Sequence, residues 1–289
     1  NGGYPGARTC RSAVIAARIA KIRHVYFYVN NIAEPYDRLA RYLQFPVDCI
    51  ITRGVTKFAT ASEYARQKLL ETLRLRPDDV LCIRNAFDGR SVQTLRQDVR
   101  RQYLKDQHSL LIGCVGEFAG NKGQQYLLEA IETLCRKYKA GTFKLILLGE
   151  GTAEHQYREY IAEHRLSDFV EIVPYQSNVF DYYNAMDIYV QPSIASDDLP
   201  FAVREAMSAG LPIIASDFAG IPELITDGLN GRLVSPGDSD ALAKAISYLV
   251  EHEPIRRAYG DASRRIYRER LCPQAVIGAY HKLLNGDFL

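Results

Sequence analysis

The sequence lacks any long hydrophobic run. No stretch of the 289 residues approaches the roughly 20 consecutive apolar residues of a membrane-spanning helix. The basic start is also not followed by the apolar core and cleavage site of a secretory signal. We therefore expect a cytoplasmic protein, and any membrane contact would be peripheral, at the inner face of the membrane.

Cysteine is present, but without an organised pattern. The chain has neither a C-x-x-C pair nor a Cys/His cluster of zinc spacing, which indicates reduced thiols in a reducing compartment. The six cysteines are Cys10, Cys49, Cys82, Cys114, Cys135 and Cys272. This scatter argues against a disulfide framework and against a structural metal site.

The chain also has little net charge, at +2, but the charge is divided unevenly. Residues 1–105 carry 19 lysines and arginines against 9 acidic residues, whereas residues 106–289 carry 17 against 25. A basic half suits an anionic partner such as a lipid headgroup surface, although a solvated face or a complementary inter-domain surface is commoner. We expect no nucleic-acid partner, because interleaved aromatics and a recognition motif are lacking.

From residue 108 onward, short apolar runs alternate with helical patterns. The expected strands lie at residues 109–116, 143–151, 170–175, 187–193, 211–216 and 231–236. Strands that are apolar on both faces and alternate with helices predict an α/β domain with a parallel, doubly wound sheet. Its ligand should bind beyond the carboxyl ends of the strands.

Residues 1–105 also have an α/β pattern. The expected helices are at 12–22 and 63–73, and the expected strands are at 24–31, near 49–52, at 57–62 and at 80–85. These elements are too few for a complete two-sided sheet, and the chain opens in mid-pattern. We therefore expect two domains, 1–105 and 106–289, with the beginning of the first absent from this chain. The glycine-rich start at residues 1–10 could border a binding cleft or be a plain loop.

The stretch SDDLPFAVREAMSAG, residues 196–210, predicts the start of a helix. An Asx residue such as Asp198 can cap a helix, and Pro200 is tolerated in its first turn. The first-turn amides would lack intrahelical partners and, with the helix dipole, would form an anion site. They belong to Leu199, Phe201 and Ala202. Glu205 could accept hydrogen bonds from sugar hydroxyls, or the acidic residues could simply complement the dipole on a wet surface.

The residues after this helix start resemble a known family. E-A-M-x-A-G-x-P-I-I-A-S begins at Glu205, G-x-P-E-L-I-x-D-G-x-x-G-x-L-V follows, and P-G-D ends at Asp238. These motifs resemble the retaining glycosyltransferases called GT4, strongly over about residues 108–250 and more loosely over 1–105. The resemblance implies the GT-B fold, with two Rossmann-like domains facing a cleft. It also implies a last helix, about residues 273–286, that crosses back to the first domain.

The resemblance implies transfer of a sugar, with retention, from a nucleotide-diphosphate sugar to a glycan, a lipid-linked or a small acceptor. UDP- and GDP-sugars are the expected donors. In the scheme proposed for the family, the departing phosphate oxygen receives the acceptor proton, so no protein nucleophile is needed. That scheme demands no metal or other cofactor, and no D-x-D pair is placed to hold a metal.

The donor site of this family is marked by an acidic residue followed, after seven others, by glutamate. The matching pair here is Asp197 and Glu205, although the family usually has glutamate in the first place. By resemblance, Glu205 would bind the ribose hydroxyls and Asp197 would face the donor sugar. The segment expected near the diphosphate comprises Leu199, Pro200, Phe201 and Ala202.

VGEFAGNKG, residues 115–123, resembles the first strand and phosphate loop of the family. Gly116 opens the turn, and Lys122 would neutralise the diphosphate, which makes it a catalytic candidate together with Asp197 and Glu205. Taken alone, Lys122 would be a solvated loop lysine. Glu117 stands where arginine is usual, and a carboxylate beside a diphosphate is repulsive.

Two further positions follow from the resemblance. Tyr175 and Gln176 would flank the nucleobase, although Tyr175 could equally be an inter-domain packing residue. Asn30 replaces the active-site histidine of the family strand on the acceptor side. Asparagine can hydrogen-bond a sugar hydroxyl but cannot take a proton. The glycine pair in LLGEG, residues 147–151, is explained by tight-turn geometry alone.

The departures at Glu117, Asn30 and Asp197 leave an alternative open. In that alternative the chain is a catalytically impaired protein of the same fold that binds a nucleotide-sugar without turning it over.

Overall fold

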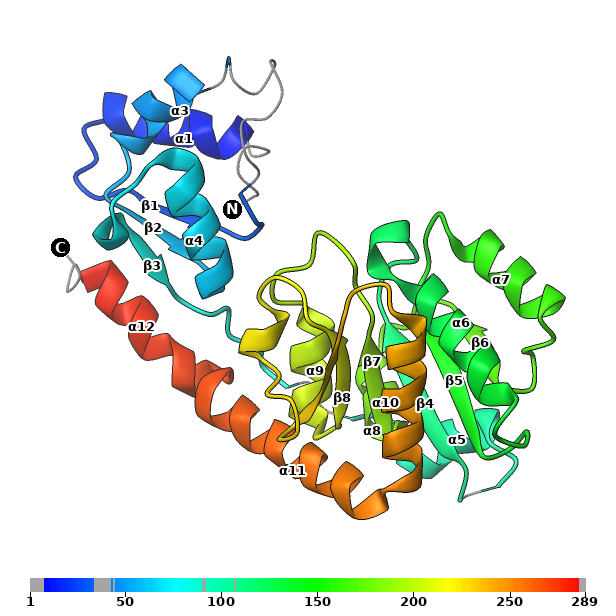
Figure 1. Cartoon of the computed structure of the whole chain (residues 1–289). Coiled ribbons are helices and arrows are strands. Elements are labelled where there is room, and N and C mark those ends of the chain that lie inside the picture. The colour runs from blue at the N-terminus through cyan, green and yellow to red at the C-terminus, as the bar shows by residue number, and fades with distance from the viewer. Residues whose placement is uncertain (1–7, 34–42, 44, 90–91, 107, 286–289) are drawn as a thin grey trace. The chain divides into compact units, whose positions relative to one another are not determined.

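The computed structural model describes residues 8–33, 43, 45–89, 92–106 and 108–285. The chain divides into two compact units, coloured along the sequence in Figure 1. Unit 1 contains residues 1–85, 196–199 and 276–289, and unit 2 contains residues 86–195 and 200–275. Most of the glycine-rich start, residues 1–7, lies outside the described residues.

Unit 1 is built on a parallel three-stranded sheet of order β1-β2-β3. The strands are β1 (Tyr26–Val29), β2 (Lys57–Thr60) and β3 (Val80–Cys82). The helices are α1 (Arg8–Ile19), α3 (Phe45–Thr52), α4 (Glu63–Leu73), the 3-10 turn η1 (Pro77–Asp79) and, for the greater part, α12 (Pro273–Asn285). Helices thus alternate with parallel strands in this half as well, as the sequence predicts.

Helix α4 begins at a local capping signal, Ser62. The Ser62 side chain accepts a hydrogen bond from Ala65 N at 2.8 Å, which satisfies one of the free amides of the first turn. The helix buries Ala65, Leu69 and Leu73, and its bounds are those predicted. On α12, Val276 and Leu283 are buried in a cluster with Ala59 and Ile83.

The strand expected near residues 49–52 is wrong, because these residues form the end of α3. The β-branched pair Ile50–Ile51 favours a strand by propensity, but tertiary contacts override it here. Ile51 is fully buried in the core of unit 1. Asp48, also buried, forms an ion pair with Arg11 of α1 at 2.9 Å. Both contacts require side chains on the same face of a helix.

Unit 2 contains a parallel six-stranded sheet of order β6-β5-β4-β7-β8-β9. The strands are β4 (Leu110–Val115), β5 (Phe143–Leu148), β6 (Val170–Val173), β7 (Ile188–Gln191), β8 (Ile213–Ser216) and β9 (Gly231–Val234). All six predicted strands are confirmed. The inner strands β7 and β8 are buried at every position because helices cover both sides of the sheet.

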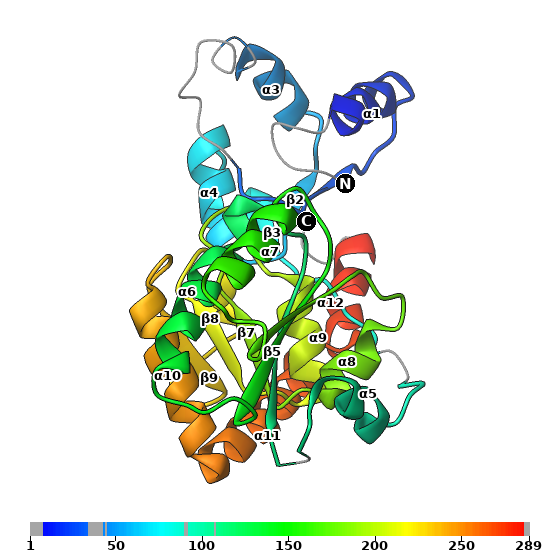
Figure 2. The same ribbon diagram turned by 90° about the vertical axis from the view of Figure 1, so that its right-hand side faces the viewer.

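Figure 2 shows α6 and α10 on one side of this sheet and α8 and α9 on the other. The helices and turns of the unit are α5 (Arg96–Tyr103), η2 (Gly120–Lys122), α6 (Gln124–Cys135), α7 (Glu154–Glu163), α8 (Val179–Ala185), α9 (Phe201–Ala209), η3 (Ile221–Glu223), α10 (Ser239–Glu251) and α11 (Glu253–Arg270). The predicted stripe of α6, at Leu127, Ile131 and Leu134, is buried. In the described residues, no helix has the length and hydropathy to cross a membrane.

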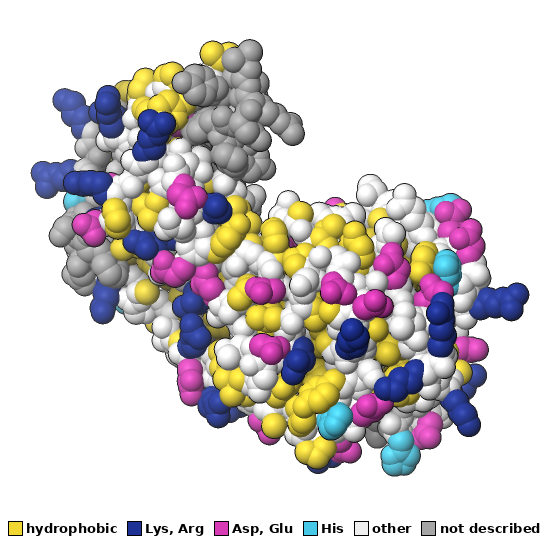
Figure 3. Space-filling view, in the orientation of Figure 1, with side chains coloured by type: hydrophobic (Ala, Val, Ile, Leu, Met, Phe, Trp, Pro, Cys, Tyr) yellow, Lys and Arg dark blue, Asp and Glu magenta, His cyan; other side chains and the backbone are white. Residues whose placement is uncertain are grey.

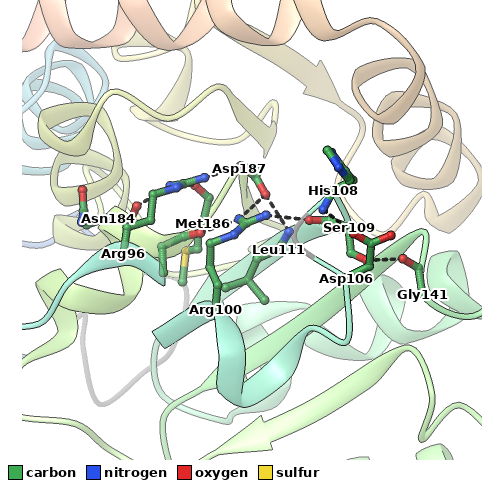
Figure 4. Close-up of polar contacts among 11 residues, drawn as sticks. Arg96, Arg100, Asp106, His108, Ser109, Leu111, Gly141, Asn184, Met186 and Asp187 are labelled. Atoms are coloured by element: carbon green, nitrogen blue, oxygen red, sulfur yellow. Dashed lines mark hydrogen bonds and ion pairs between the residues drawn. The ribbon is translucent and has the colours of Figure 1, made fainter. Parts of the chain in front are cut away.

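Helix α5, which the sequence pattern does not reveal, is held at the amino edge of this sheet by ionic contacts (Figure 4). Asp187 immediately precedes β7, and its Oδ2 accepts a hydrogen bond from Leu111 N of β4 at 2.8 Å. Arg96 Nη2 and Arg100 Nη1 reach the same carboxylate at 2.5 and 2.6 Å. The helix buries Val99. Ionic contacts therefore supply much of what fixes α5.

Candidate active site

A pocket of about 670 Å³ opens in unit 2 at the carboxyl ends of β4, β5 and β6. It is lined by Val115, Gly116, Glu117, Leu148, Gly149, Glu150, Gly151, Tyr175, Gln176, Ser177, Val179 and Glu205. The order of strands along the chain reverses between β4 and β7, and doubly wound sheets bind ligands beyond the strand ends at such a point. The volume is within the roughly 300–1,000 Å³ typical of small-molecule sites.

Glycines allow the segments after β4 and β5 to run close together along the pocket. Phe118 N donates a hydrogen bond to Glu150 O at 2.9 Å, which continues the strand pairing past the end of the sheet. A Cβ at Gly149 would lie less than 3.0 Å from the Gly116 carbonyl oxygen, and one at Gly151 would meet the Phe118 backbone equally closely. The glycine pair is therefore required by backbone approach, in addition to its turn geometry.

Glu205 reaches the pocket from the second turn of α9 and is held from behind by Tyr183 of α8. The Tyr183 hydroxyl donates a hydrogen bond to Glu205 Oε2 at 2.9 Å. Tyr183 is fully buried, whereas Glu205 is half-buried. Burial raises the pKa of Tyr183 well above its ordinary value, and the neighbouring Tyr189 and Glu205 raise it further. The phenol is thus a protonated donor at neutral pH.

The outer part of the pocket combines an aromatic ring with carboxylates. Tyr175 is 66% exposed, and its neighbour Gln176 donates to the Pro174 carbonyl at 3.2 Å. The described lining includes Glu117, Glu150 and Glu205 but no lysine or arginine. Such a surface suits hydroxyl and amine donors better than it suits phosphate.

Helix α9 begins two residues later than predicted from a cap at Asp198. Pro200 is the N-cap, with no side-chain capping bond, so the first-turn amides are those of Phe201, Ala202 and Val203. Asp198 does not cap this helix, and its Oδ1 instead accepts a hydrogen bond from Ser62 Oγ at 2.5 Å within unit 1. Of the expected amides, that of Leu199 therefore lies outside the helix.

These features agree with a family assignment made by comparison. The family model for glycosyl transferases group 1 matches residues 96–266, more than half of the chain. The chain belongs to this family. The motifs that suggested such a resemblance lie within the matched range.

Two proteins with similar sequences are named as glycosyltransferases. The amylovoran biosynthesis glycosyltransferase AmsK of Erwinia amylovora is 34% identical over 151 residues, which cover 50% of this chain and 37% of that protein. The putative glycosyltransferase EpsD of Bacillus subtilis (strain 168) is 29% identical over 239 residues, which cover 80% of this chain and 58% of that protein. The chain thus spans about half the length of these relatives.

Solved structures support the predicted fold. Anabaena Alr3699/HepE in complex with UDP superposes with a TM-score of 0.85 at 20% identity, covering 96% of this chain and 76% of that one. Sucrose-phosphate synthase (tll1590) from Thermosynechococcus elongatus superposes with a TM-score of 0.77 at 19% identity, covering 96% and 71%. Together with the two parallel sheets, these likenesses confirm the α/β, GT-B fold.

The structure gathers only part of the expected group 1 site in one pocket. Five of the expected residues line it, namely Gly116, Glu117, Tyr175, Gln176 and Glu205. Lys122, half-buried in η2, and the α9 residues Phe201 and Ala202 belong to unit 2 but are not part of the lining. Asn30, Asp197 and Leu199 belong to unit 1.

Several residues that line the pocket were not predicted from the sequence. Leu148, Gly149, Glu150 and Gly151 belong to the stretch that turn geometry alone would explain, and Ser177 and Val179 lie within three residues after the expected base-binding pair. The signal that points to them is position, because they follow strands whose carboxyl ends share one edge of a parallel sheet. Tyr183 carries no such signal, since it reads as an apolar core residue.

In the described ranges, no group of three or more His, Cys, Asp or Glu side chains is arranged to hold a metal ion.

We expect Gly149→Ala to destabilise unit 2 and to disrupt the pocket. The added methyl group would overlap the Gly116 carbonyl, which belongs to the backbone and cannot rotate away. The expected loss is about 1–3 kcal/mol of unfolding free energy, measured by urea denaturation. Gly120→Ala is the control, because a Cβ there meets nothing within 4 Å. Equal stability of the two variants would contradict the close approach.

Proposed function

We propose that the protein is a retaining glycosyltransferase that takes a sugar from a nucleotide-diphosphate sugar. The observation that carries this proposal is the pocket at the carboxyl ends of β4 to β6, into which Glu205 projects. A carboxylate that accepts from the two vicinal hydroxyls of ribose would occupy this position, with Tyr175 and Gln176 beside the base. UDP is the first candidate nucleotide, because the HepE structures are complexes with UDP, UDP-glucose, or UDP and glucose.

Because the described lining contains no lysine or arginine, it offers no side-chain cation to the diphosphate of the donor. In our proposal the neutral base and ribose fill the carboxylate-lined part, and the diphosphate extends toward the start of α9. Phe201 and Ala202 supply amides there, and this nine-residue helix adds its dipole. Lys122 would add a positive charge. Placed this way, the diphosphate avoids Glu117 and Glu150, which would otherwise repel it.

The chemistry proposed is cleavage of the bond between the anomeric carbon and the departing phosphate oxygen. As that bond breaks, the sugar gains oxocarbenium character and the diphosphate gains negative charge, which the α9 amides and Lys122 would stabilise. The departing phosphate oxygen then takes the acceptor proton as the acceptor oxygen bonds to the anomeric carbon on the same face. We propose that this transfer is metal-independent, which activity in the presence of excess EDTA would support.

On unit 1 we propose Asp197 as a contact of the donor sugar and Asn30 as a ligand of an acceptor hydroxyl. Asn30 Oδ1 accepts from Asn85 Nδ2 at 3.3 Å, which supports a fixed orientation of the amide. Neither the GT4 assignment nor the two-domain division at residue 105 enters this proposal, and both stay predictions.

The test is a panel of UDP-, GDP- and ADP-sugars with glycan and lipid-linked acceptors, followed by release of nucleoside diphosphate and formation of an α- or β-linked product. Acceptor-dependent release with retained configuration is the expected result. Tight binding without release in the presence of every acceptor would favour the alternative of an impaired nucleotide-sugar-binding protein. That alternative draws support from Asn30, which cannot take a proton, and from Glu117 at the pocket.

We also propose a peripheral contact with anionic lipid through α1 and α3. Ile15, Ile19 and Ile22 are 43%, 78% and 56% exposed, and Val47 and Ile50 of α3 are 46% and 54% exposed. Figure 3 shows hydrophobic side chains at this end of unit 1 with Lys and Arg side chains beside them. Exposed basic residues in this stretch of the sequence are Arg18, Lys21, Arg23 and Arg53. An apolar surface with a basic surround is typical of interfacial binding.

We expect the protein to sediment with vesicles that contain phosphatidylglycerol and much less with pure phosphatidylcholine vesicles. Ile19→Asp should lower the partition coefficient roughly tenfold or more, because one buried isoleucine side chain contributes about 1.5–3 kcal/mol. Ile277→Asp, which changes an exposed isoleucine of α12, is the control. Equal binding of both variants would argue against this surface.

A further inference from the structure

Tyr183 is the buried partner of the carboxylate on which the donor site depends. It lies on α8, is fully buried, and its hydroxyl donates to Glu205 Oε2 at 2.9 Å. None of the motifs read from the sequence includes it. Its contact with a residue that lines the pocket connects it to the geometry of a bound ligand.

The Tyr183 ring is fixed by aromatic neighbours. Phe180 and Tyr189 each have ring centroids 5.7 Å from it, with interplanar angles of 60° and 56°. Helices α8 and α9 also pack against each other. A ring held in this way cannot move its hydroxyl to follow a mobile carboxylate, so the carboxylate must adjust to the hydroxyl.

The chemistry of the pair leaves acceptor capacity for a ligand. A phenol has a single proton to donate, and a carboxylate has about four lone-pair positions on two oxygens. The bond to Tyr183 uses one position on Oε2. A carboxylate bound by one phenol therefore keeps acceptor capacity for the hydroxyls of a ligand.

We propose that Tyr183 is a positioning residue that orients the Glu205 carboxylate so that it accepts from both vicinal hydroxyls of a ribose. This inference rests on the proposed function, and it adds that selectivity for a ribonucleotide over a deoxyribonucleotide depends on a residue outside the pocket. Loss of the Tyr183 bond would remove one restraint on the orientation of the Glu205 carboxylate, and a less ordered carboxylate would hold the diol less well.

A merely structural role for Tyr183 predicts something different. In that case the hydroxyl would only satisfy buried polar groups, and its loss would lower stability without changing the preference between ligands. The readout that separates the two roles is therefore the ratio of affinities for UDP and 2′-deoxy-UDP, which share base and diphosphate.

The experiment is isothermal titration of the full chain with UDP and with 2′-deoxy-UDP, for the wild type, Tyr183→Phe and Tyr182→Phe. Phenylalanine keeps the ring and its packing, and the Glu205 carboxylate faces a pocket from which it can be hydrated, so the variant should fold. Tyr182 is the matched control, because it is the adjacent buried tyrosine of α8 and packs against Tyr103 instead. Thermal melts of each protein report stability separately.

Tyr183→Phe should weaken UDP binding on the order of 10-fold to 100-fold, as expected when a hydrogen bond that orients a charged group is lost. Binding of 2′-deoxy-UDP should change much less, so the ribose preference falls, while Tyr182→Phe keeps it. Wild-type preference in Tyr183→Phe, or equal loss for both ligands, would overturn the inference alone. Failure of the wild type to bind UDP, GDP or ADP would instead overturn the proposed function and the inference with it.

Discussion

Asp187→Ala should unfold unit 2 at a markedly lower temperature than the wild type. The substitution leaves Arg96 and Arg100 without the carboxylate that both contact at 2.5 and 2.6 Å, and it removes the acceptor for Leu111 N. The Asp187 side chain is only 15% exposed. Removal of one member of a buried ionic cluster costs about 3–5 kcal/mol, and we expect the lower end of this range because the Arg96 side chain is 43% exposed whereas Arg100 stays largely buried.

The measurement is thermal unfolding followed by circular dichroism, with an expected fall in Tm of roughly 10 °C. The matched control is Asp98→Ala, which breaks an exposed pair with Arg101 on the same helix, at 3.1 Å. Exposed pairs of this kind contribute about 0–1 kcal/mol, so this variant should melt close to the wild type. Similar melting of both variants would mean that α5 does not depend on Asp187.

Glu205→Ala should remove most of the affinity for nucleoside diphosphates. Each hydrogen bond to a charged group contributes about 1.5–3 kcal/mol, so the loss of two to a ribose predicts at least about 100-fold weaker binding. The loss in stability should be small, about 1 kcal/mol, because the shortened side chain lets water from the pocket reach the Tyr183 hydroxyl.

Titration calorimetry with UDP, GDP and ADP measures this affinity. Glu163→Ala, which removes an exposed glutamate of α7, should bind like the wild type. If Glu205→Ala bound as the wild type does but melted lower, the carboxylate would have a structural role in α9 and no role in binding.

The central sheet could be predicted because its strands are unusual in composition. Residues such as Ile112, Ile146 and Ile214 face helices whichever side of the sheet they lie on, so each strand is an apolar run bounded by glycine, proline or serine. Such runs can be recognised from the local sequence, and all six predicted strands are present.

Elements fixed by distant partners could not be predicted in the same way. Helix α5 has one buried residue, Val99, and its position depends on Asp187, some 90 residues later in the chain. The β-branched pair in α3 is helical because Ile51 lies in the core of unit 1 and Asp48 pairs with Arg11 of α1. Neither dependence is visible in a local pattern.

The lining of the pocket could be predicted where its residues belong to a motif, and less so where only the fold brings them together. Glu205, Tyr175 and Gln176 carry recognisable side chains, and they line one pocket. Gly149 and Gly151 carry no side chain, and their importance comes from backbone approach between two strand ends that only the fold brings together. In the sequence Tyr183 resembles an apolar core residue, because the carboxylate that its hydroxyl contacts belongs to Glu205, 22 positions away.

The most direct test of the account is a crystal structure of the chain with the nucleoside diphosphate that binds most tightly in solution. The account predicts ribose hydroxyls within hydrogen-bond distance of the Glu205 carboxylate, the base beside Tyr175, and the diphosphate at the Phe201 and Ala202 amides. A nucleotide bound at any other place, with the Glu205 pocket empty, would contradict it.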